Sequence, residues 1–523
     1  MLTGIANNED LYSLDPEGSI IGSADAMDAA TCAERDRVGP TTKNMTNEST
    51  PAQYVGMNGF VDDPIDILAI AGHVREYHNW RFNEPGKDYP GYPHNAIRFE
   101  GVGGWERGWN FDEYYADMVE AGVDVVPCIQ GSVPWLFDDG FDPDRKPVPP
   151  GKRSTDPTAY AAHAHFMFQY AARYGSTEVE ADLLTLADDQ EEMSGLGLIA
   201  SIENWNEPNN DWSHPEAWFE PEEFAAMTSA DYDGHEGELG DTYGVKNADP
   251  NMTFVLGGTA EMSIEYFKDM YKWFQDNRND EKFAADVINV HHYTRDGDPE
   301  TPALSPEEDD VRGRMKEVIA FRDEYVPDAE VWITEFGWDT HPQSPVRPEV
   351  NDPYDIYDVQ AQWLVRSYLE YAAAGADRAT MYMSRDVDDP DATQYATSGL
   401  TDGKDEWNRR PSWYHLAALG TILDGLSYAD QIDTTLDDVR IYRFEAEESD
   451  AVTYAIWSAT SEGRSIDEAT ISLPDWHEGS VTVLELIEDA STPSEQSLDS
   501  NADGEITLTI SEEVKFIQIT SDE

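Results

Sequence analysis

Two glutamates lie in short sequence motifs that are rich in polar and aromatic residues. Glu207 belongs to the run Trp-Asn-Glu-Pro-Asn at 205–209, and Glu335 belongs to Thr-Glu-Phe-Gly at 334–337. Each follows an apolar stretch, so each carboxylate is predicted at the end of a buried strand, where it is costly unless it is paired or used. Two carboxylates facing each other across a cleft are the groups that cleavage of a glycosidic bond requires.

The chain around these motifs alternates between short apolar runs and longer runs of helical period, which is typical of βα units. Eight strands are predicted, at 53–58, 73–78, 123–130, 198–206, 252–258, 286–293, 330–335 and 378–384. Helices are predicted at 111–121, 158–174, 263–277, 311–325, 357–374 and 411–424. This order favours an α/β fold of the (β/α)₈ TIM-barrel type, in which functional groups gather at the C-terminal ends of the strands.

A doubly wound open sheet is the alternative fold. It should carry a Gly-rich phosphate turn after an early strand, but the turn after the first predicted strand is NGFVDDP. Three regions are therefore expected: a polar arm at 1–50, the barrel at 51–424, and a C-terminal domain at 425–523. The last region alternates apolar and polar residues with period 2, which predicts an antiparallel β-sandwich.

With the strands assigned, the two motifs resemble those of the clan A retaining glycoside hydrolases. The form W-N-E-P-N, together with a C-terminal sandwich, is most similar to glycoside hydrolase family 39, over residues 53–424 and into the sandwich. The resemblance implies a glycosidase that hydrolyses O-glycosyl compounds. It would cleave β-glycosidic bonds of oligo- or polysaccharides, β-xylosides among them, by double displacement and without a cofactor.

The resemblance also implies roles for individual residues. Glu207 would be the general acid/base and must start protonated, whereas Glu335 would be the ionised nucleophile. Asn206 would hydrogen-bond the sugar hydroxyl next to the anomeric carbon. The eighth predicted strand departs from the pattern, because it ends in Met381-Tyr382-Met383 where these families often carry a tryptophan. Either another aromatic ring forms the floor of that subsite, or the subsite suits a different sugar.

Five further residues are candidates for the site. By the same resemblance, Arg75 in the second strand corresponds to the clan's arginine that holds the nucleophile ionised. The physics fits, since a guanidinium favours the charged form of a nearby carboxylate. His291 and Tyr293 match the family's H-x-Y and lie at i, i+2, so both face one side of the sixth strand. Trp135 and Trp338 fall in predicted loops at the barrel mouth, where flat rings could stack on sugars. A structural role remains the alternative for each.

The composition restricts the partners. There are 34 Lys and Arg against 106 Asp and Glu, which gives a formal net charge of −72. Such a chain is not expected to bind nucleic acid or anionic membranes, because both need cationic side chains. The acidic residues are spread along the whole chain, which indicates a halophilic protein, of archaeal type, whose self-repulsion is screened by salt. An ordinary acidic protein is the alternative.

Few other sites are predicted. The two cysteines, Cys32 and Cys128, do not make a disulfide framework. The stretch 499–504 resembles the start of a calcium loop but lacks its final glutamate, and an Asp-Gly turn explains it equally well. No metal is therefore assigned. Residues 1–10 lack the features of a signal peptide, so a cytoplasmic location is expected, or a secreted one if a leader preceded them.

The sequence leaves three hypotheses for the function. The first is a retaining glycosidase, the second a barrel that binds carbohydrate without catalysis, and the third a transglycosylase with the same site. The second needs the tryptophans but not the carboxylates. The third shares the covalent intermediate of the first, so only the acceptor distinguishes them. The sugar, exo or endo action, and the oligomeric state are not predicted.

Overall fold

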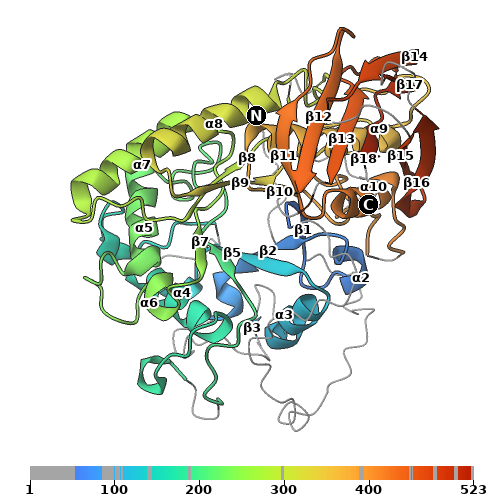
Figure 1. Ribbon diagram of the computed structural model, residues 1–523. Coiled ribbons are helices and arrows are strands. Elements are labelled where there is room, and N and C mark those ends of the chain that lie inside the picture. The colour runs from blue at the N-terminus through green and yellow to red at the C-terminus, as the bar shows by residue number, and fades with distance from the viewer. Residues whose placement is uncertain are drawn as a thin grey trace.

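The computed structural model contains a closed parallel barrel followed by an antiparallel β domain (Figure 1). It describes residues 53–84, 99–100, 106–107, 110–137, 144–186, 190–295, 300–387, 394–404, 406–446, 449, 451–474, 480–499 and 505–519. The predicted polar arm, Cys32 and most of the 499–504 stretch lie outside these residues. In the described part of the chain, no helix combines the length and the hydropathy that a membrane span requires.

Eight strands close the barrel in the order β1-β10-β9-β8-β7-β6-β5-β2, which confirms the predicted TIM barrel. Their bounds are β1 Val55–Gly59, β2 His73–Asn79, β5 Asp124–Gln130, β6 Ser201–Glu203, β7 Thr253–Val255, β8 Val287–His291, β9 Glu330–Glu335 and β10 Arg378–Met381. Each lies within or beside a predicted strand. The fourth barrel strand, β6, is much shorter than the predicted 198–206, since the chain leaves the sheet after Glu203.

The barrel interior is apolar at one level and polar above it. Val126, Val255, Val287 and Trp332 form a separate buried cluster contributed by four of the strands. Inward-facing residues of one strand recur at every second position, so the next inward positions toward the C-terminal ends carry the polar groups of the site. The apolar layer therefore supports the polar layer from below.

Helices pack around the barrel as predicted, with additions. They are α2 Ile65–Leu68, α3 Phe111–Glu120, α4 Ala161–Tyr174, α5 Pro221–Asp233, α6 Val245–Ala248, α7 Ile264–Asn277, α8 Val311–Tyr325, α9 Ile356–Ala374 and α10 Pro411–Ile422. A short hairpin of β3 Phe99–Glu100 and β4 Glu106–Arg107 precedes α3. The sequence prediction missed α5, although Glu220 and Glu223 form a capping box at its start.

The C-terminal domain is two stacked antiparallel sheets, as the sequence predicts. The larger has the order β11-β12-β13-β18-β15-β16, with β11 Leu426–Gln431, β12 Val439–Ala446, β13 Val452–Ser458, β18 Lys515–Ile519, β15 Ser480–Ile487 and β16 Ala490–Asp499. The smaller pairs β14 Ser465–Ser472 with β17 Glu505–Ser511. Strands β11 and β16 were not predicted, because their exposed polar residues obscure the alternation.

The larger sheet uses both faces. Ile441, Tyr454 and Ile456 belong to a core shared with the smaller sheet. Tyr442 and Trp457 alternate with them and join the main core of the barrel. Period-2 alternation thus places one apolar face against β14 and β17 and the other against α9 and α10, which contact β11, β15 and β16.

Candidate active site

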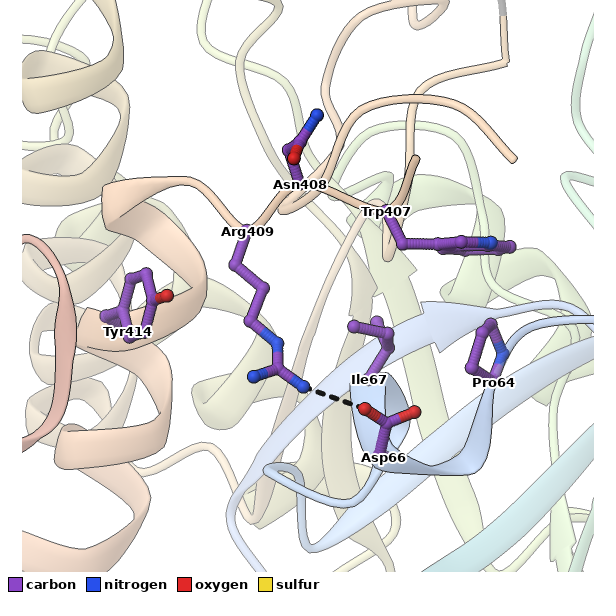
Figure 2. A pocket seen from close by; sticks show the side chains of 7 residues that line it. All are labelled: Pro64, Asp66, Ile67, Trp407, Asn408, Arg409 and Tyr414. Carbon is purple, nitrogen blue, oxygen red and sulfur yellow. Dashed lines mark hydrogen bonds and ion pairs between the residues drawn. The ribbon is translucent and has the colours of Figure 1, made fainter. Parts of the chain in front are cut away.

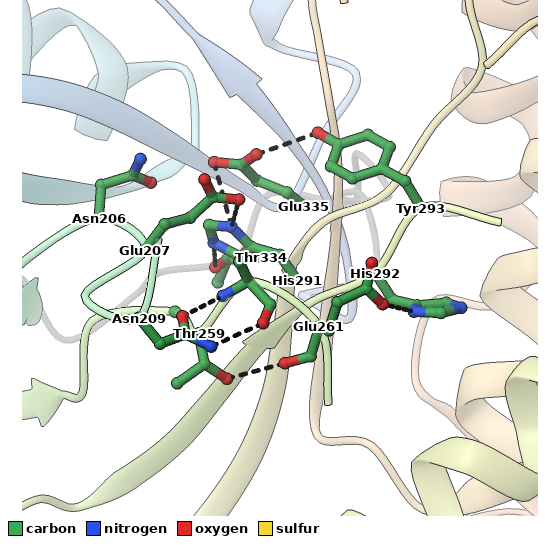
Figure 3. A network of polar contacts seen from close by, with 12 residues as sticks. Asn206, Glu207, Asn209, Thr259, Glu261, His291, His292, Tyr293, Thr334 and Glu335 are labelled. Carbon is green, nitrogen blue, oxygen red and sulfur yellow. Dashed lines mark hydrogen bonds and ion pairs between the residues drawn. The ribbon is translucent and has the colours of Figure 1, made fainter. Parts of the chain in front are cut away.

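The two predicted carboxylates reach the same mouth of the barrel (Figure 3). Glu335 is the last residue of β9, and Glu207 lies four residues beyond the end of β6. Glu207 has a left-handed backbone with φ 43°, which is uncommon for a residue other than glycine. Its amide donates to the carbonyl of Gly258 at 2.9 Å, so the loop after β7 holds this turn.

A local irregularity in the sheet brings Glu335 inward. Strands β8 and β9 pair regularly up to Val290 and Ile333, but the next pair is His291 with Glu335, so Thr334 is an extra residue. Extra residues of this kind are common beside active sites, where they redirect a side chain. As a result, both Thr334 and Glu335 contact His291.

His291 lies between the two carboxylates. Its Nδ1 is 3.2 Å from Glu207 Oε1 and 3.6 Å from Glu335 Oε1, and one ligand atom from each of the three residues lies within 4.8 Å of the others. Its Nε2 is 3.1 Å from the Thr334 hydroxyl, which itself donates to Asn289 at 2.9 Å. Nε2 therefore donates to Thr334, and Nδ1 is the nitrogen that faces the two carboxylates.

Glu335 is surrounded by donors. Arg75 Nη1 lies 2.7 Å from Oε1, the Tyr77 hydroxyl also donates to Oε1, and the Tyr293 hydroxyl donates to Oε2 at 3.0 Å. Burial raises the pKa of Glu335, but His291, Arg75 and the two tyrosines outweigh burial and lower this pKa overall. Glu335 is therefore held as a carboxylate at neutral pH.

Arg75 organises the base of the site. Its Nε and Nη2 bind the two oxygens of Glu203 at 2.6 and 3.0 Å, and its Nη1 also reaches Asn58 at 3.0 Å. Arg75 and Glu203 are both fully buried. The sequence analysis found Arg75 but missed Glu203 and Asn58. Glu203 lies four residues before Glu207 at the end of a buried strand, which was a usable signal.

Two more contacts of Arg75 explain neighbouring residues. Its Nη2 donates to Asn206 Oδ1 at 2.9 Å and to Cys128 Sγ at 3.2 Å. The first contact occupies the amide oxygen of Asn206, so its NH₂ group is the part that a ligand could use. Cys128 is buried as expected, but it packs under a guanidinium and not only among apolar side chains.

Aromatic rings enclose the Glu335 side of the mouth. Tyr293 and Tyr395 have ring centroids 4.3 Å apart, and Tyr382 lies 6.0 Å from Tyr395 and 6.3 Å from Tyr77. With Phe60 they belong to one cluster, separate from the main core. Tyr382 follows β10, so it occupies the region where the sequence analysis noted a missing tryptophan.

The two predicted tryptophans lie in different surroundings. Trp338 is 2% exposed; its Nε1 donates to Thr294 at 3.0 Å and its ring meets Trp363, so its described contacts are not with the carboxylate pair. Trp135 is half-buried, and its Nε1 donates to the carbonyl of Glu84 at 3.1 Å. This bond joins the loops that follow β5 and β2.

Glu207, His291 and Glu335 also have the donor types that a divalent cation uses. The guanidinium of Arg75 lies 2.7 Å from Glu335, and its positive charge opposes the binding of a cation there. A separate surface pocket is lined by Pro64, Asp66, Ile67, Trp407, Asn408, Arg409 and Tyr414 (Figure 2). It shares no residue with the carboxylate site.

Comparison with known proteins supports the fold. No family profile matches the sequence, and no curated protein is significantly similar to it. A GH30 endoxylanase from Clostridium papyrosolvens C71 has TM-score 0.51 and 10% identity, covering 90% of this chain and 97% of its own. A family 51 α-L-arabinofuranosidase from Bifidobacterium longum has TM-score 0.53 and 15% identity, covering 90% and 97%.

A glucosidase from Croceicoccus marinus is similar to the same extent, with TM-score 0.53 and 12% identity over 91% of this chain and 98% of its own. At such identities the likeness shows a shared barrel-and-sandwich architecture and nothing finer. The first two structures are described as members of families 30 and 51. The resemblance to family 39 and the halophilic, archaeal assignment stay predictions.

Proposed function

We propose that this protein is a retaining glycoside hydrolase that works by double displacement. The observation that supports this best is the closeness of Glu207 and Glu335, which have carboxylate oxygens within 4.8 Å of each other. Retaining enzymes hold their two carboxyl groups about 5–5.5 Å apart, whereas inverting enzymes leave room for a water at roughly 6.5–9.5 Å. The short separation favours direct attack by one carboxylate on the sugar.

The surroundings of the two carboxylates suit different roles. Glu335 is buried among Arg75 and two tyrosine hydroxyls, so it is ionised and can attack the anomeric carbon. Glu207 faces the mouth, with 16% of its side chain exposed, and contacts His291 at 3.2 Å. It would protonate the leaving oxygen, and then remove a proton from the water that hydrolyses the glycosyl-enzyme.

The other residues would stabilise the changing charge of Glu335 and bind the substrate. As Glu335 forms its bond to the sugar it loses negative charge, and Arg75 would retain its second partner Glu203 through this change. Tyr293 would donate to whichever oxygen of Glu335 is not bonded to the sugar. The free NH₂ group of Asn206 would donate to the hydroxyl beside the anomeric carbon, a contact that strengthens in the transition state.

The expected substrates are β-linked neutral sugars. Proteins of similar fold are described as xylanases, an α-L-arabinofuranosidase and a glucosidase. Xylosides, arabinofuranosides and glucosides are therefore the substrates to screen. β-Xylosides remain the first choice from the family 39 resemblance. Aryl glycosides assayed in molar KCl would identify the sugar, and added alcohol or sugar acceptors would reveal any transglycosylation.

Azide rescue tests the assignment. Glu335→Ala should lose hydrolysis, and azide should restore turnover with a glycosyl azide of inverted configuration, because azide then attacks from the vacated face. Glu207→Ala should give an azide of retained configuration from an activated aryl glycoside. Glu265→Ala, which removes an exposed carboxylate on α7, is the matched control and should leave activity unchanged. Inverted product from the unmodified enzyme would contradict the proposal.

A further inference from the structure

Three buried polar side chains near the barrel mouth play no part in the network around Arg75. Asn79, Gln130 and Ser132 are 4%, 6% and 0% exposed. Within the part of the chain that the structure describes, Asn79 Nδ2, Gln130 Nε2 and Ser132 Oγ have no hydrogen-bond partner. Buried polar groups are almost always paired, so three such groups in neighbouring positions call for a partner from outside the part of the chain that the structure describes.

Strand geometry places Asn79 on the inner face of the barrel. Side chains two residues apart on a strand share a face. Arg75 and Tyr77 of β2 both contact Glu335, so this face of β2 points into the barrel. Asn79 is the next residue on that face and the last residue of β2. It therefore lies about 7 Å further along the strand than Tyr77, on the mouth side of Glu335.

The same reasoning applies to β5. Val126 belongs to the interior apolar cluster, and Cys128 accepts a hydrogen bond from Arg75, so the even-numbered residues of β5 face inward. Gln130 is the last of them. It is also the register partner of Asn79, which places the two amides side by side on adjacent strands. Ser132 follows in the loop directly after β5.

The chemistry of this group suits a neutral sugar. Two amide NH₂ groups and a hydroxyl can donate to sugar oxygens, and the hydroxyl can also accept. Arg75 is engaged by Glu203 and Glu335, so it offers no free charge to an acidic sugar. The carboxylates of Glu335 and Glu207 nearby would repel one. A uronic acid is therefore disfavoured at this position.

An aromatic side wall completes the arrangement. Trp135 follows Ser132 by three residues and is half-buried, and its indole nitrogen is already bonded to the carbonyl of Glu84. Its ring meets the buried Trp80 at right angles, with centroids 5.8 Å apart. A fixed, partly exposed ring three residues from a polar donor offers the apolar face against which sugars stack.

We propose that Asn79, Gln130 and Ser132 form the polar floor of a sugar-binding subsite beside Glu335, with Trp135 as its wall, and that this subsite takes a neutral sugar unit. The inference rests on the proposed function. It names the residues on the β2–β5 side of the mouth that contact one sugar unit of the substrate. These residues would bind and orient substrate, and they would take no part in bond cleavage.

Replacing each floor residue by an apolar or smaller one distinguishes a role in sugar binding from a role in stabilising the fold. The variants are Asn79→Leu, Gln130→Met and Ser132→Ala, each assayed for KM, kcat and thermal unfolding on the best neutral aryl glycoside. We expect KM to rise by about two- to tenfold for each, as loss of one hydrogen bond predicts. Thermal unfolding without sugar should be unchanged or occur at higher temperature, since a group without a partner destabilises the folded state.

Ser367→Ala is the matched control. Ser367 is also fully buried, its hydroxyl also lacks a partner among the described residues, and it lies on α9, away from the mouth. This variant should resemble Ser132→Ala in unfolding and the unmodified enzyme in KM. If the three floor variants instead lose thermal stability and sugar binding in parallel, their role is structural and the proposal is wrong.

Measuring sugar binding directly makes the test independent of catalysis. Titration calorimetry with neutral monosaccharides and with the matching uronic acids, on the unmodified protein and the floor variants, should show binding of a neutral sugar that the variants weaken. Preference for the uronic acid, or equal binding by all variants, would overturn the subsite. A protein that binds the sugar but hydrolyses no glycoside would overturn the proposed function and leave the subsite standing.

Discussion

At the scale of single residues, the site depends on a buried arginine shared by two acids. Arg75 contacts Glu203 and Glu335 at 2.6 and 2.7 Å, and all three side chains are buried. An arginine suits this position because its planar fork can bind two partners at once, whereas a lysine is a point charge. The pKa of Glu335 is lowered because its charged form has more partners than burial can offset.

Arg75→Lys should therefore impair catalysis and shift its pH dependence. Loss of a charge-assisted hydrogen bond to Glu335 should reduce kcat/KM by about 10- to 100-fold. The pKa of Glu335 should rise toward its ordinary value, so the acidic limb of the pH profile of kcat/KM should move to higher pH. The measurement is a pH–rate profile of both enzymes.

Arg366→Lys provides the control, because Arg366 binds Glu307 at 2.8 Å and is also buried, but lies on α9 at the domain interface. It should lower stability without moving the acidic limb. An unchanged profile for Arg75→Lys would contradict the role given to Arg75.

At the scale of elements, a second histidine ties three segments together. His292, just beyond β8, has Nδ1 2.9 Å from Glu261 in the loop after β7 and Nε2 2.6 Å from Asp309 before α8. Burial lowers the pKa of His292, but the hydrogen bonds to Asp309 and Glu261 outweigh burial and raise it overall. The charged imidazole thus holds together loops that flank Glu207 and His291.

This arrangement makes stability depend on pH in a defined direction. A raised pKa in the folded state means that the folded protein keeps a proton that the unfolded chain releases near its ordinary value, about 6.5. The contribution of His292 is complete below that value and is lost as pH rises through the folded pKa. His292→Gln should be less stable by about 1–3 kcal/mol at pH 5.5, with a difference that shrinks toward pH 9.

Urea unfolding of the unmodified protein and of His292→Gln, from pH 5.5 to pH 9, measures this difference in stability. A difference that stays constant, or grows with pH, would show that His292 is neutral in the folded protein.

The docking of the sandwich is the other feature at this scale. Trp457 is fully buried; its Nε1 donates to Glu307 at 2.7 Å, and its ring meets Tyr442 with centroids 4.9 Å apart. Arg366 of α9 binds the same Glu307 and the carbonyl of Thr460. Barrel and sandwich therefore share a core, and two groups of the sandwich hydrogen-bond to a buried ion pair of the barrel, which predicts that the two parts unfold together.

Trp457→Ala should weaken this coupling. Loss of a buried tryptophan should lower the free energy of unfolding by about 3–5 kcal/mol, and calorimetry should resolve two transitions in place of one. Phe267→Ala on α7, a buried residue of the barrel on the side away from the sandwich in Figure 1, should destabilise comparably and keep one transition. Two transitions already present in the unmodified protein would rule out coupled unfolding.

At the scale of the whole molecule, charge dominates. A net charge of −72 on 523 residues produces strong self-repulsion at low ionic strength. The screening length falls from about 30 Å at 0.01 M salt to about 3 Å at 1 M. Stability should therefore depend on salt far more than in an ordinary protein.

Thermal unfolding in rising KCl tests this expectation. The unfolding temperature should increase steadily from 0.01 M into the molar range, where the screening length falls to about 3 Å. Sucrose, which stabilises by exclusion from the surface without screening charge, is the control and should not replace the salt. Full stability without salt would contradict the halophilic interpretation of the acidic composition.

Much of the fold and part of the site followed from the sequence by itself. Period-3.6 and period-2 patterns are local, so they predicted the barrel strands, most helices and the sandwich. Strand β6 was predicted too long, and β11 and β16 were not predicted, because a short strand and exposed strands carry little apolar pattern. The motifs around residues 207 and 335 gave the two carboxylates.

Only the tertiary structure decided how these groups meet. The extra residue at Thr334 turns Glu335 inward, and strand alternation alone would have placed these neighbours on opposite faces. The sharing of Arg75 by Glu203 and Glu335, 128 and 260 residues away, arises when the barrel closes. Contacts between distant strands depend on register and closure, which no local pattern encodes, and these contacts lower the pKa of Glu335.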